Sequence, residues 1–189
     1  MLKEITLKNG QQANLRRIRA EDYEEVMIFL DKFSRGKGAI WTHQYPNQPK
    51  KDREESVRHY ESDDELFLGV WKDNELIAEG SIQIKNIRDP WSVKQAGFGL
   101  CALDEYTSLG LGTILLKELE EWAVKKKVHR IFGTVRHNNR RALGLYLKAG
   151  FQIEGIARET GYFDNQWQHE YYLGKILNAQ IDANLSSDK

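Results

Sequence analysis

The stretch of residues 103–151 limits the fold of this 189-residue chain more than any other part of the sequence. An extended run ends there in Thr107-Ser108-Leu109-Gly110-Leu111-Gly112-Thr113, and an amphipathic helix follows directly. After an intervening strand, a second helix begins near Asn139 and stops at Gly150. The order strand, helix, strand, helix at this spacing predicts a right-handed crossover, in which a helix joins two parallel strands of one sheet.

Small residues at the start of the first helix indicate a phosphate-binding turn. Gly110 and Gly112 place no bulky side chain before the first main-chain N–H groups, and the helix dipole favours negative charge there. A helix that simply starts at a glycine turn would look the same, so the two glycines alone are weak evidence. Their position between a strand and a helix strengthens the interpretation, because such a crossover leaves an anion-binding crevice. The dinucleotide-binding pattern G-x-G-x-x-G is absent.

The remaining elements predict one α/β domain. Residues 5–18 form a hairpin around Lys8-Asn9-Gly10, and helical spacing predicts a helix over residues 21–33. An irregular loop over residues 34–49 precedes a charged helix over residues 52–62. Further strands are predicted at residues 66–71, 76–87, 93–103, 130–136, 151–158 and 167–174, the first three as an antiparallel meander. We therefore expect a single domain over residues 1–177 and a polar tail over residues 178–189.

The helix after Gly112 is expected to pack on a sheet. Its apolar stripe at helical spacing consists of Leu111, Leu115, Leu119 and Trp122. The side chains expected to face water are Lys117, Glu118, Glu121 and Lys125.

Composition excludes several classes of partner. The 28 basic and 28 acidic residues cancel at a sequence pI of about 7.0, so no overall field attracts nucleic acid or an anionic membrane. Cys101 is the single cysteine, which rules out an internal disulfide and a multi-thiolate metal site. The charged N-terminus and the lack of a long apolar run predict neither a signal peptide nor a membrane span. We expect a soluble cytoplasmic protein.

Two motifs in this order resemble those of the GNAT N-acetyltransferase superfamily, and the resemblance covers residues 15–173. The superfamily motif Gln/Arg-x-x-Gly-x-Gly/Ala corresponds to Thr107-x-x-Gly110-x-Gly112, in which Thr107 departs from the pattern. The second motif is Asn-x-x-Ala-x-x-x-Tyr-x-x-x-Gly-Phe, and it is met in full by Asn139, Ala142, Tyr146, Gly150 and Phe151.

The resemblance implies a central mixed, twisted sheet of about seven strands flanked by helices. It implies acetyl-CoA as cosubstrate, no metal and an amine as second substrate, and it is compatible with a homodimer. The segment after Phe151 looks most like the bacterial branch that acetylates ribosomal-protein N-termini, diamines and small amine antibiotics. By the same resemblance, the main chain of Ala102, Leu103 and Asp104 pairs with the pantetheine amides. The implied cofactor-binding residues of the turn and the second helix are Ser108, Leu109, Gly110, Leu111, Gly112, Thr113, Asn139 and Tyr146.

Tyr146 and Glu79 are the predicted catalytic residues. A buried phenol with an ordinary pKa near 10 stays protonated beside a thiolate whose thiol has a pKa near 8.5, so Tyr146 can donate a proton to the departing sulfur. Without the surrounding motif, an ordinary core tyrosine would be the simpler interpretation. The amine must lose a proton before it attacks, and Glu79 on a neighbouring strand is the candidate base. The related branch often has a strand glutamate where this chain has Gly97, and a water relay through main-chain carbonyls is the alternative to Glu79.

Several other residues have two interpretations. Trp41 and Tyr45 in the irregular loop either form the apolar wall of the acceptor pocket or cover the sheet. His43 and His169 are interpreted as surface histidines and Cys101 as a small buried hydrophobe. An acidic set could attract a polyamine, although a solvated helix face is the simpler explanation; it comprises Glu54, Glu55, Glu61, Asp63, Asp64 and Glu65.

These patterns together predict an N-acetyltransferase. The acetyl group is expected to pass from acetyl-CoA to a primary amine, on a peptide N-terminus, a polyamine or a small molecule, by direct attack in a ternary complex. The alternative is a non-catalytic acyl-CoA-binding module, because Thr107 and Gly97 stand where the family often has functional side chains.

Overall fold

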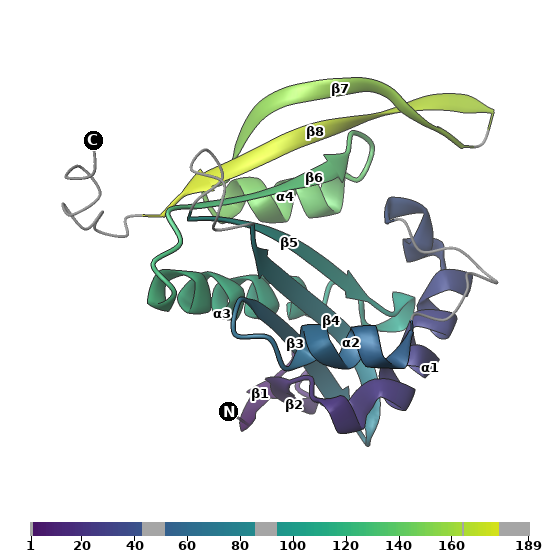
Figure 1. The fold of residues 1–189 in the computed structure, drawn as a ribbon. Helices are drawn as coiled ribbons and strands as arrows, with labels where there is room; N and C mark the ends of the chain where they lie inside the picture. The colour runs from purple at the N-terminus through teal and green to yellow at the C-terminus, as the bar shows by residue number, and fades with distance from the viewer. Residues whose placement is uncertain (1, 43–51, 86–93, 164, 178–189) are drawn as a thin grey trace, which may run out of the picture.

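The computed structural model describes residues 2–42, 52–85, 94–163 and 165–177. Its strands form one mixed eight-stranded sheet in the order β1-β2-β3-β4-β5-β6-β8-β7, with helices packed against it (Figure 1). The expected α/β class is confirmed, and the sheet is close to the size that the resemblance implied.

The elements follow the predicted order and extend beyond the predicted ends at the C-terminus. The strands are β1 Leu2–Thr6, β2 Gln12–Arg17, β3 Glu65–Lys72, β4 Glu75–Ile84, β5 Gln95–Ala102, β6 Arg130–Arg136, β7 Gln152–Phe163 and β8 Gln166–Ile176. The helices are α1 Tyr23–Arg35, α2 Arg53–Tyr60, α3 Leu111–Lys125 and α4 Arg140–Lys148, with short 3-10 helices η1 Ala20–Asp22, η2 Lys37–Trp41 and η3 Asp104–Tyr106. β7 and β8 pair with each other beyond their predicted ends and form a long hairpin arm (Figure 1).

The sheet divides between β5 and β6. These two strands are the one parallel pair in the described parts of the chain, and only Gln95, Ala96 and Gly97 of β5 pair with β6. Beyond that point β5 continues to Ala102 beside β4, while β6 continues to Arg136 beside β8. The two strands therefore diverge toward their carboxyl ends, where open α/β sheets bind ligands.

Each face of the sheet carries its own core, because successive side chains of a strand point to opposite faces. From β5, Phe98, Leu100 and Ala102 pack in the core that contains α3 and α4. Cys101 packs instead in the core that contains α1 and the α2 residue Tyr60. We call these two sides of the sheet the α3 face and the α1 face.

Helix α3 packs as predicted along its apolar stripe, with one correction. Leu111, Leu115 and Leu119 are buried, and Trp122 is half-buried against the same core. Glu118 was expected to face water, but only 7% of it is exposed. Its carboxylate pairs with the Lys3 ammonium of β1 at 2.5 Å, because the edge of the sheet lies against this side of the helix. The spacing of apolar residues identifies the side of α3 that packs on the sheet, but it does not reveal that the edge strand β1 covers a second side of the helix.

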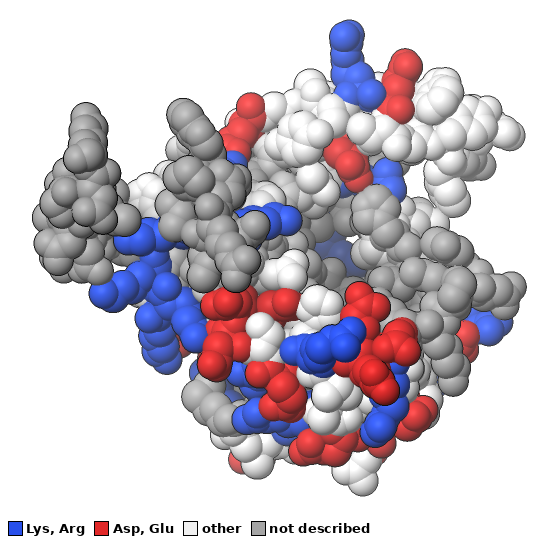
Figure 2. Space-filling model, in the orientation of Figure 1, with Lys and Arg blue, Asp and Glu red and all other residues white. Residues whose placement is uncertain are grey.

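The acidic set around α2 also needs one correction. Figure 2 shows Asp and Glu side chains gathered over α2. Glu54 and Glu55 lie in the first turn of that helix, where the helix dipole favours negative charge. Glu65 belongs to β3 instead and is buried, and its carboxylate accepts a hydrogen bond from the Gln83 amide and lies 2.8 Å from the Nδ1 atom of His59. A dipole-stabilised helix start thus accounts for the first acids, while Glu65 is a structural residue.

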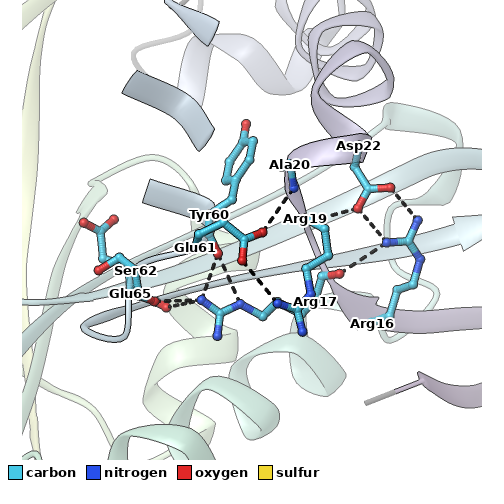
Figure 3. A network of polar contacts seen from close by, with 9 residues as sticks. All are labelled: Arg16, Arg17, Arg19, Ala20, Asp22, Tyr60, Glu61, Ser62 and Glu65. Atoms are coloured by element: carbon cyan, nitrogen blue, oxygen red, sulfur yellow. Dashed lines mark hydrogen bonds and ion pairs between the residues drawn. The ribbon is translucent and has the colours of Figure 1, made fainter. Parts of the chain in front are cut away.

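A polar network fixes the helices of the α1 face to the sheet (Figure 3). Arg16 on β2 donates two hydrogen bonds to the Asp22 carboxylate, at 2.6 and 2.7 Å, and stacks on the Trp71 ring. Arg17 donates to the main-chain carbonyls of Tyr60 and Ser62 at 2.8 and 2.7 Å. Two adjacent arginines of one strand thereby anchor the start of α1 and the end of α2.

We expect Asp22→Asn to destabilise the fold in a pH-dependent way. Burial raises the pKa of the Asp22 carboxyl, but hydrogen bonds from Arg16 and the Arg19 N–H outweigh burial and lower this pKa overall. A lowered pKa means that the carboxylate stabilises the folded state above its unfolded pKa of about 3.9 and that this stability is lost as the pH falls further. Urea unfolding should show a loss of about 2 kcal/mol at pH 7 and a smaller gap near pH 3. An equal gap at both pH values would contradict the ion-pair explanation.

Candidate functional site

A cavity of about 400 Å³ lies where β5 and β6 diverge. Residues 98–102 of β5 line one wall and residues 134–136 of β6 the other. The glycine turn, the start of α3 and part of α4 close the cavity on the α3 face. Because side chains from both faces line it, including Ala102 and Cys101, the cavity connects the two sides of the sheet.

The glycine turn has the geometry of an anion cradle. Gly110 lies in the left-handed region at φ 92°, and Ser108 also has a positive φ of 65°. Thr113 and Ile114 both donate to the Gly110 carbonyl, so the N–H groups of Leu111 and Gly112 precede the first hydrogen bonds of α3. A Cβ at Gly112 would lie 2.8 Å from Leu145 Cδ2, because α3 and α4 approach closely at that point.

Two cations that the sequence analysis did not identify lie at this cradle. The Lys8 N–H donates to the Leu109 carbonyl at 3.1 Å, which joins the β1–β2 turn to the glycine turn. A Cβ at Gly110 would lie 3.5 Å from Lys8 Cγ, so the aliphatic part of the Lys8 side chain runs beside Gly110, and both residues line the cavity. Arg141 lines the cavity from the first turn of α4. These side chains bring positive charge to the turn in which Thr107 replaces the Gln or Arg of the motif. No sequence pattern links Lys8 to a turn a hundred residues away.

Asn139 starts the second helix of the site. Its side-chain oxygen accepts from the Ala142 N–H at 3.1 Å, which caps α4. Asn139 also lines the cavity. The Asn of the second motif is thus explained as the cap at the start of α4.

Tyr146 is held on the same helix with its ring in an aromatic cluster. Its ring packs edge-on against Phe98 at a centroid distance of 5.2 Å and against Phe151 at 5.9 Å. The side chain is buried and lines the cavity, and no described residue hydrogen-bonds its hydroxyl. Burial, with a smaller contribution from Cys101, raises the pKa of the phenol to about 12. The cavity therefore contains a neutral O–H donor over the whole physiological pH range.

The other residues predicted to bind the cofactor are divided between the cavity and its surroundings. Ala102, Ser108 and Thr113 line it, whereas Leu103, Asp104 and Leu109 do not. The Leu103 N–H donates to the Ile77 carbonyl at 3.0 Å. The Asp104 carboxylate accepts from the N–H groups of Lys37 and Gly38, at 2.6 and 3.0 Å, and so fixes η2 beside the cavity.

The structure does not bring Glu79 to the cavity wall. Glu79 lies on β4, half-buried on the α1 face, directly opposite Cys101 in register. Cys101 on β5 lines the cavity, and Glu79 lies beside it on the next strand, β4. The Glu79 carboxylate is therefore one strand away from the cavity wall. On its other side, Glu79 is close enough to Tyr60 to raise the pKa of that phenol, after the larger effect of burial.

The two residues predicted to bind the acceptor cannot both be placed. Trp41 is the last residue of η2, next to the cavity-lining Thr42. Tyr45 lies outside the described residues, as does His43.

Arg136 and Glu170 line the cavity and were not identified from the sequence. They are cross-strand neighbours on β6 and β8, and their charged groups lie 3.5 Å apart. More than thirty residues separate them in the chain, so only the pairing of β6 with β8 brings them together. They extend from the α1 face, with Thr134 on the same side of β6.

A second hollow of about 700 Å³ adjoins the first on the α1 face and shares Phe98, Gly99 and Thr134 with it. Gly97 lines this hollow. Among the described residues there is no group of three or more His, Cys, Asp or Glu side chains arranged to hold a metal ion. None of the described helices is long and apolar enough to cross a membrane.

The cleft between diverging strands, with an anion cradle on one side and a buried phenol beside it, is the arrangement of an acyl-CoA-dependent transferase. The sequence profile of the acetyltransferase (GNAT) family matches residues 36–151, which is more than half of the chain. The chain therefore belongs to the GNAT acetyltransferase family.

Comparison with individual proteins agrees with this family. The chain is 29% identical over 82 residues to an L-amino acid N-acetyltransferase of Escherichia coli K12, a match that covers 43% of this chain and 51% of that relative. It thus matches about half the length of its curated relative. A GNAT acetyltransferase of Streptococcus pneumoniae has the same fold, with a TM-score of 0.79, 23% identity and coverage of 87% and 99%. A putative acetyltransferase of Salmonella typhimurium, solved with acetyl-CoA, superposes with a TM-score of 0.73, 14% identity and coverage of 90% and 96%.

Proposed function

We propose that this protein transfers an acetyl group from acetyl-CoA to a primary amine by direct attack in a ternary complex. The observation that supports this most is the shared cavity, in which the N–H groups of the glycine turn and the Tyr146 phenol lie on the same side of one cleft. An anion cradle alone would serve binding. A neutral proton donor beside it suits the departure of a thiolate.

The N–H groups and the positive charges on the cofactor side of the cavity support binding of acetyl-CoA. The N–H groups around Gly110 and Gly112 would hold the pyrophosphate, with Lys8 and Arg141 adding positive charge. The exposed edge of β5 near Ala102 would hold the pantetheine amides where β6 has moved away. When bound, acetyl-CoA supplies the thioester whose carbonyl carbon is attacked.

Each chemical role then falls to a residue of this chain. The two substrates are held together in the cleft, which replaces a collision with a positioned pair. Tyr146 donates its phenolic proton as sulfur leaves, and the pKa of about 12 keeps that proton in place until then. For the ammonium proton we propose Glu79, reached through water past Cys101, with a water chain along main-chain carbonyls as the alternative route.

Glu79→Gln distinguishes these two routes. If Glu79 takes the proton, turnover should fall about tenfold near neutral pH and much less at high pH, where free amine is abundant. Steady-state CoA release between pH 6.5 and pH 10 measures the effect. Glu75→Gln on the same strand is the matched control, because Glu75 pairs with Lys32 at the surface. A small loss that is uniform across pH would remove Glu79 from the mechanism and favour the water chain.

The acceptors that agree with the proposed function are peptide N-termini, polyamines and small amines. The Escherichia coli relative named for L-amino acids falls within this range. Trp41 and Tyr45 remain our candidates for the apolar wall of the acceptor pocket, and a homodimer is our proposal for assembly.

The test is CoA release on incubation with acetyl-CoA and a panel of peptides, polyamines, aminoglycosides and amino acids. Mass spectrometry of the products identifies the acetylated nitrogen. Binding of CoA without release by any amine would support the non-catalytic acyl-CoA-binding alternative. Failure to bind CoA would refute both.

A further inference from the structure

Among the described residues, the Arg136–Glu170 ion pair combines burial with a lack of hydrogen bonds. Both side chains are mostly buried, at 16% and 15% exposed. Even so, neither the guanidinium nor the carboxylate makes a hydrogen bond within the described parts of the chain, and their closest atoms are 3.5 Å apart. Buried charges are normally hydrogen-bonded, and a guanidinium has five N–H donors to satisfy.

An ion pair between β8 and helix α3 shows what a satisfied pair looks like in this protein. Lys175 on β8 donates to both oxygens of Glu120 at 2.7 and 2.8 Å, and these side chains are buried to a similar degree, at 22% and 20% exposed. That pair lies outside the cavity. The loose pair is the one that lines it.

β7, which lies beyond β8 from β6, leaves little freedom on one side of Arg136. β7 changes register between Ala157 and Gly161, so that it carries extra residues opposite β8. A Cβ at Gly161 would lie 2.9 Å from Arg136 Nη1, which means that the glycine lets the β7 main chain cover the guanidinium. β7 thus covers one side of the guanidinium, and Arg136 lines the cavity on another side.

We propose that Arg136 and Glu170 recognise the acceptor and that the acceptor is a free amino acid. Arg136 binds its carboxylate through the guanidinium fork, and Glu170 binds its ammonium. A zwitterion supplies one charge of each sign at a short separation, which matches the two under-bonded groups. A peptide N-terminus carries the ammonium without the adjacent carboxylate, and a polyamine carries no carboxylate at all.

This inference rests on the proposed acetyl transfer, which balances for such an acceptor. The ammonium first gives one proton to the base or to water, and the neutral nitrogen then forms a bond to the acetyl carbon. The carbon–sulfur bond breaks, and the sulfur leaves as the CoA thiol with the proton from Tyr146. The second proton of the nitrogen passes to the Tyr146 oxygen, which restores the phenol. The product amide has lost its positive charge, so it no longer interacts with Glu170 as the substrate did. The pair therefore favours substrate over product at the same site.

The test compares free L-amino acids with their carboxamides, which keep the side chain and the ammonium and lose the carboxylate. The full chain at saturating acetyl-CoA should use the acids with a kcat/KM about tenfold or more above that of the amides. Arg136→Gln should raise KM for the acids to the level of the amides and leave the amides nearly unchanged. Glu170→Gln should raise KM for the acids and for the amides, because both kinds of acceptor carry the ammonium. Glu120→Gln, which breaks the satisfied pair, should leave the preference intact.

Binding is measured separately from turnover, by the rise in melting temperature of the CoA-loaded protein on addition of an amino acid. A rise that Arg136→Gln removes supports the inference even where no acetylation occurs, and in that case only the proposed function fails. The inference is overturned if amides or polyamines are used as well as acids. It is also overturned if Arg136→Gln lowers kcat/KM equally for all acceptors, or if no amino acid binds or reacts.

Discussion

Gly110→Glu should abolish acetyl-CoA binding while the chain remains folded. The new side chain would bring bulk and negative charge to the cradle, where phosphate is expected. Gly110 has φ 92°, so any L-residue there also costs about 1–2 kcal/mol of folding stability. Calorimetry with acetyl-CoA should show affinity lower by about two orders of magnitude or more, equivalent to ~3 kcal/mol.

Gly150→Glu is the control that separates the effect of backbone strain from the effect of losing the phosphate-binding site. Gly150 ends α4 at φ 91°, so the same substitution introduces the same strain and the same charge. Its side chain would meet Lys175 at ordinary contact distance, and Gly150 does not line the cavity. This variant should therefore bind acetyl-CoA normally. Unchanged affinity in a folded Gly110→Glu protein would show that the phosphates bind elsewhere.

Tyr146→Phe should slow turnover and leave folding and acetyl-CoA affinity intact. Phenylalanine keeps the ring contacts with Phe98 and Phe151 and removes only the hydroxyl. General acid assistance is typically worth about 10²- to 10⁴-fold, and we expect a loss near or below the lower limit, because water can partly replace the donor. Since the pKa of Tyr146 is raised to about 12, the phenol stays protonated and the loss should be the same from pH 6 to pH 10.

The measurement is steady-state CoA release with saturating acetyl-CoA and a competent amine. Tyr171→Phe is the control, because Tyr171 packs against the same core and does not line the cavity. Wild-type turnover in the Tyr146 variant would reduce this residue to a core side chain. An equal loss of acetyl-CoA binding would make it a ligand contact instead of an acid.

Local patterns were sufficient for the elements and for the cofactor side of the site. The glycine turn, the Asn139 cap and Tyr146 all lie within or next to one strand–helix–strand–helix unit, so their spacing in sequence nearly determines their positions in space. Glu79 was correctly assigned to a strand beside β5. Sequence spacing did not indicate that it would lie on the α1 face, one strand away from the cavity wall.

Arg141 apart, the site contacts that sequence reasoning missed join distant segments. Lys8 reaches the glycine turn because β1 and β2 lie at the sheet edge beside α3, and the same arrangement buries Glu118. Arg136 and Glu170 meet because β8 inserts between β6 and β7. A strand order with such an insertion does not follow from the period of apolar residues, which describes one element at a time.

The short pairing between β5 and β6 has a consequence for the rigidity of the protein with acetyl-CoA bound. Three residue pairs between β5 and β6 hold the strands β1 to β5 to the rest of the sheet, which consists of β6, β8 and β7. Beyond these pairs, the edge of β5 that faces β6 has no neighbouring strand among the described residues. A pantetheine arm lying along that edge would act as a short extra strand that ties the two halves together. Acetyl-CoA would then stabilise the sheet as well as supply the acetyl group. The acceptor would meet a surface stiffened by the first substrate, which favours binding of acetyl-CoA before the amine.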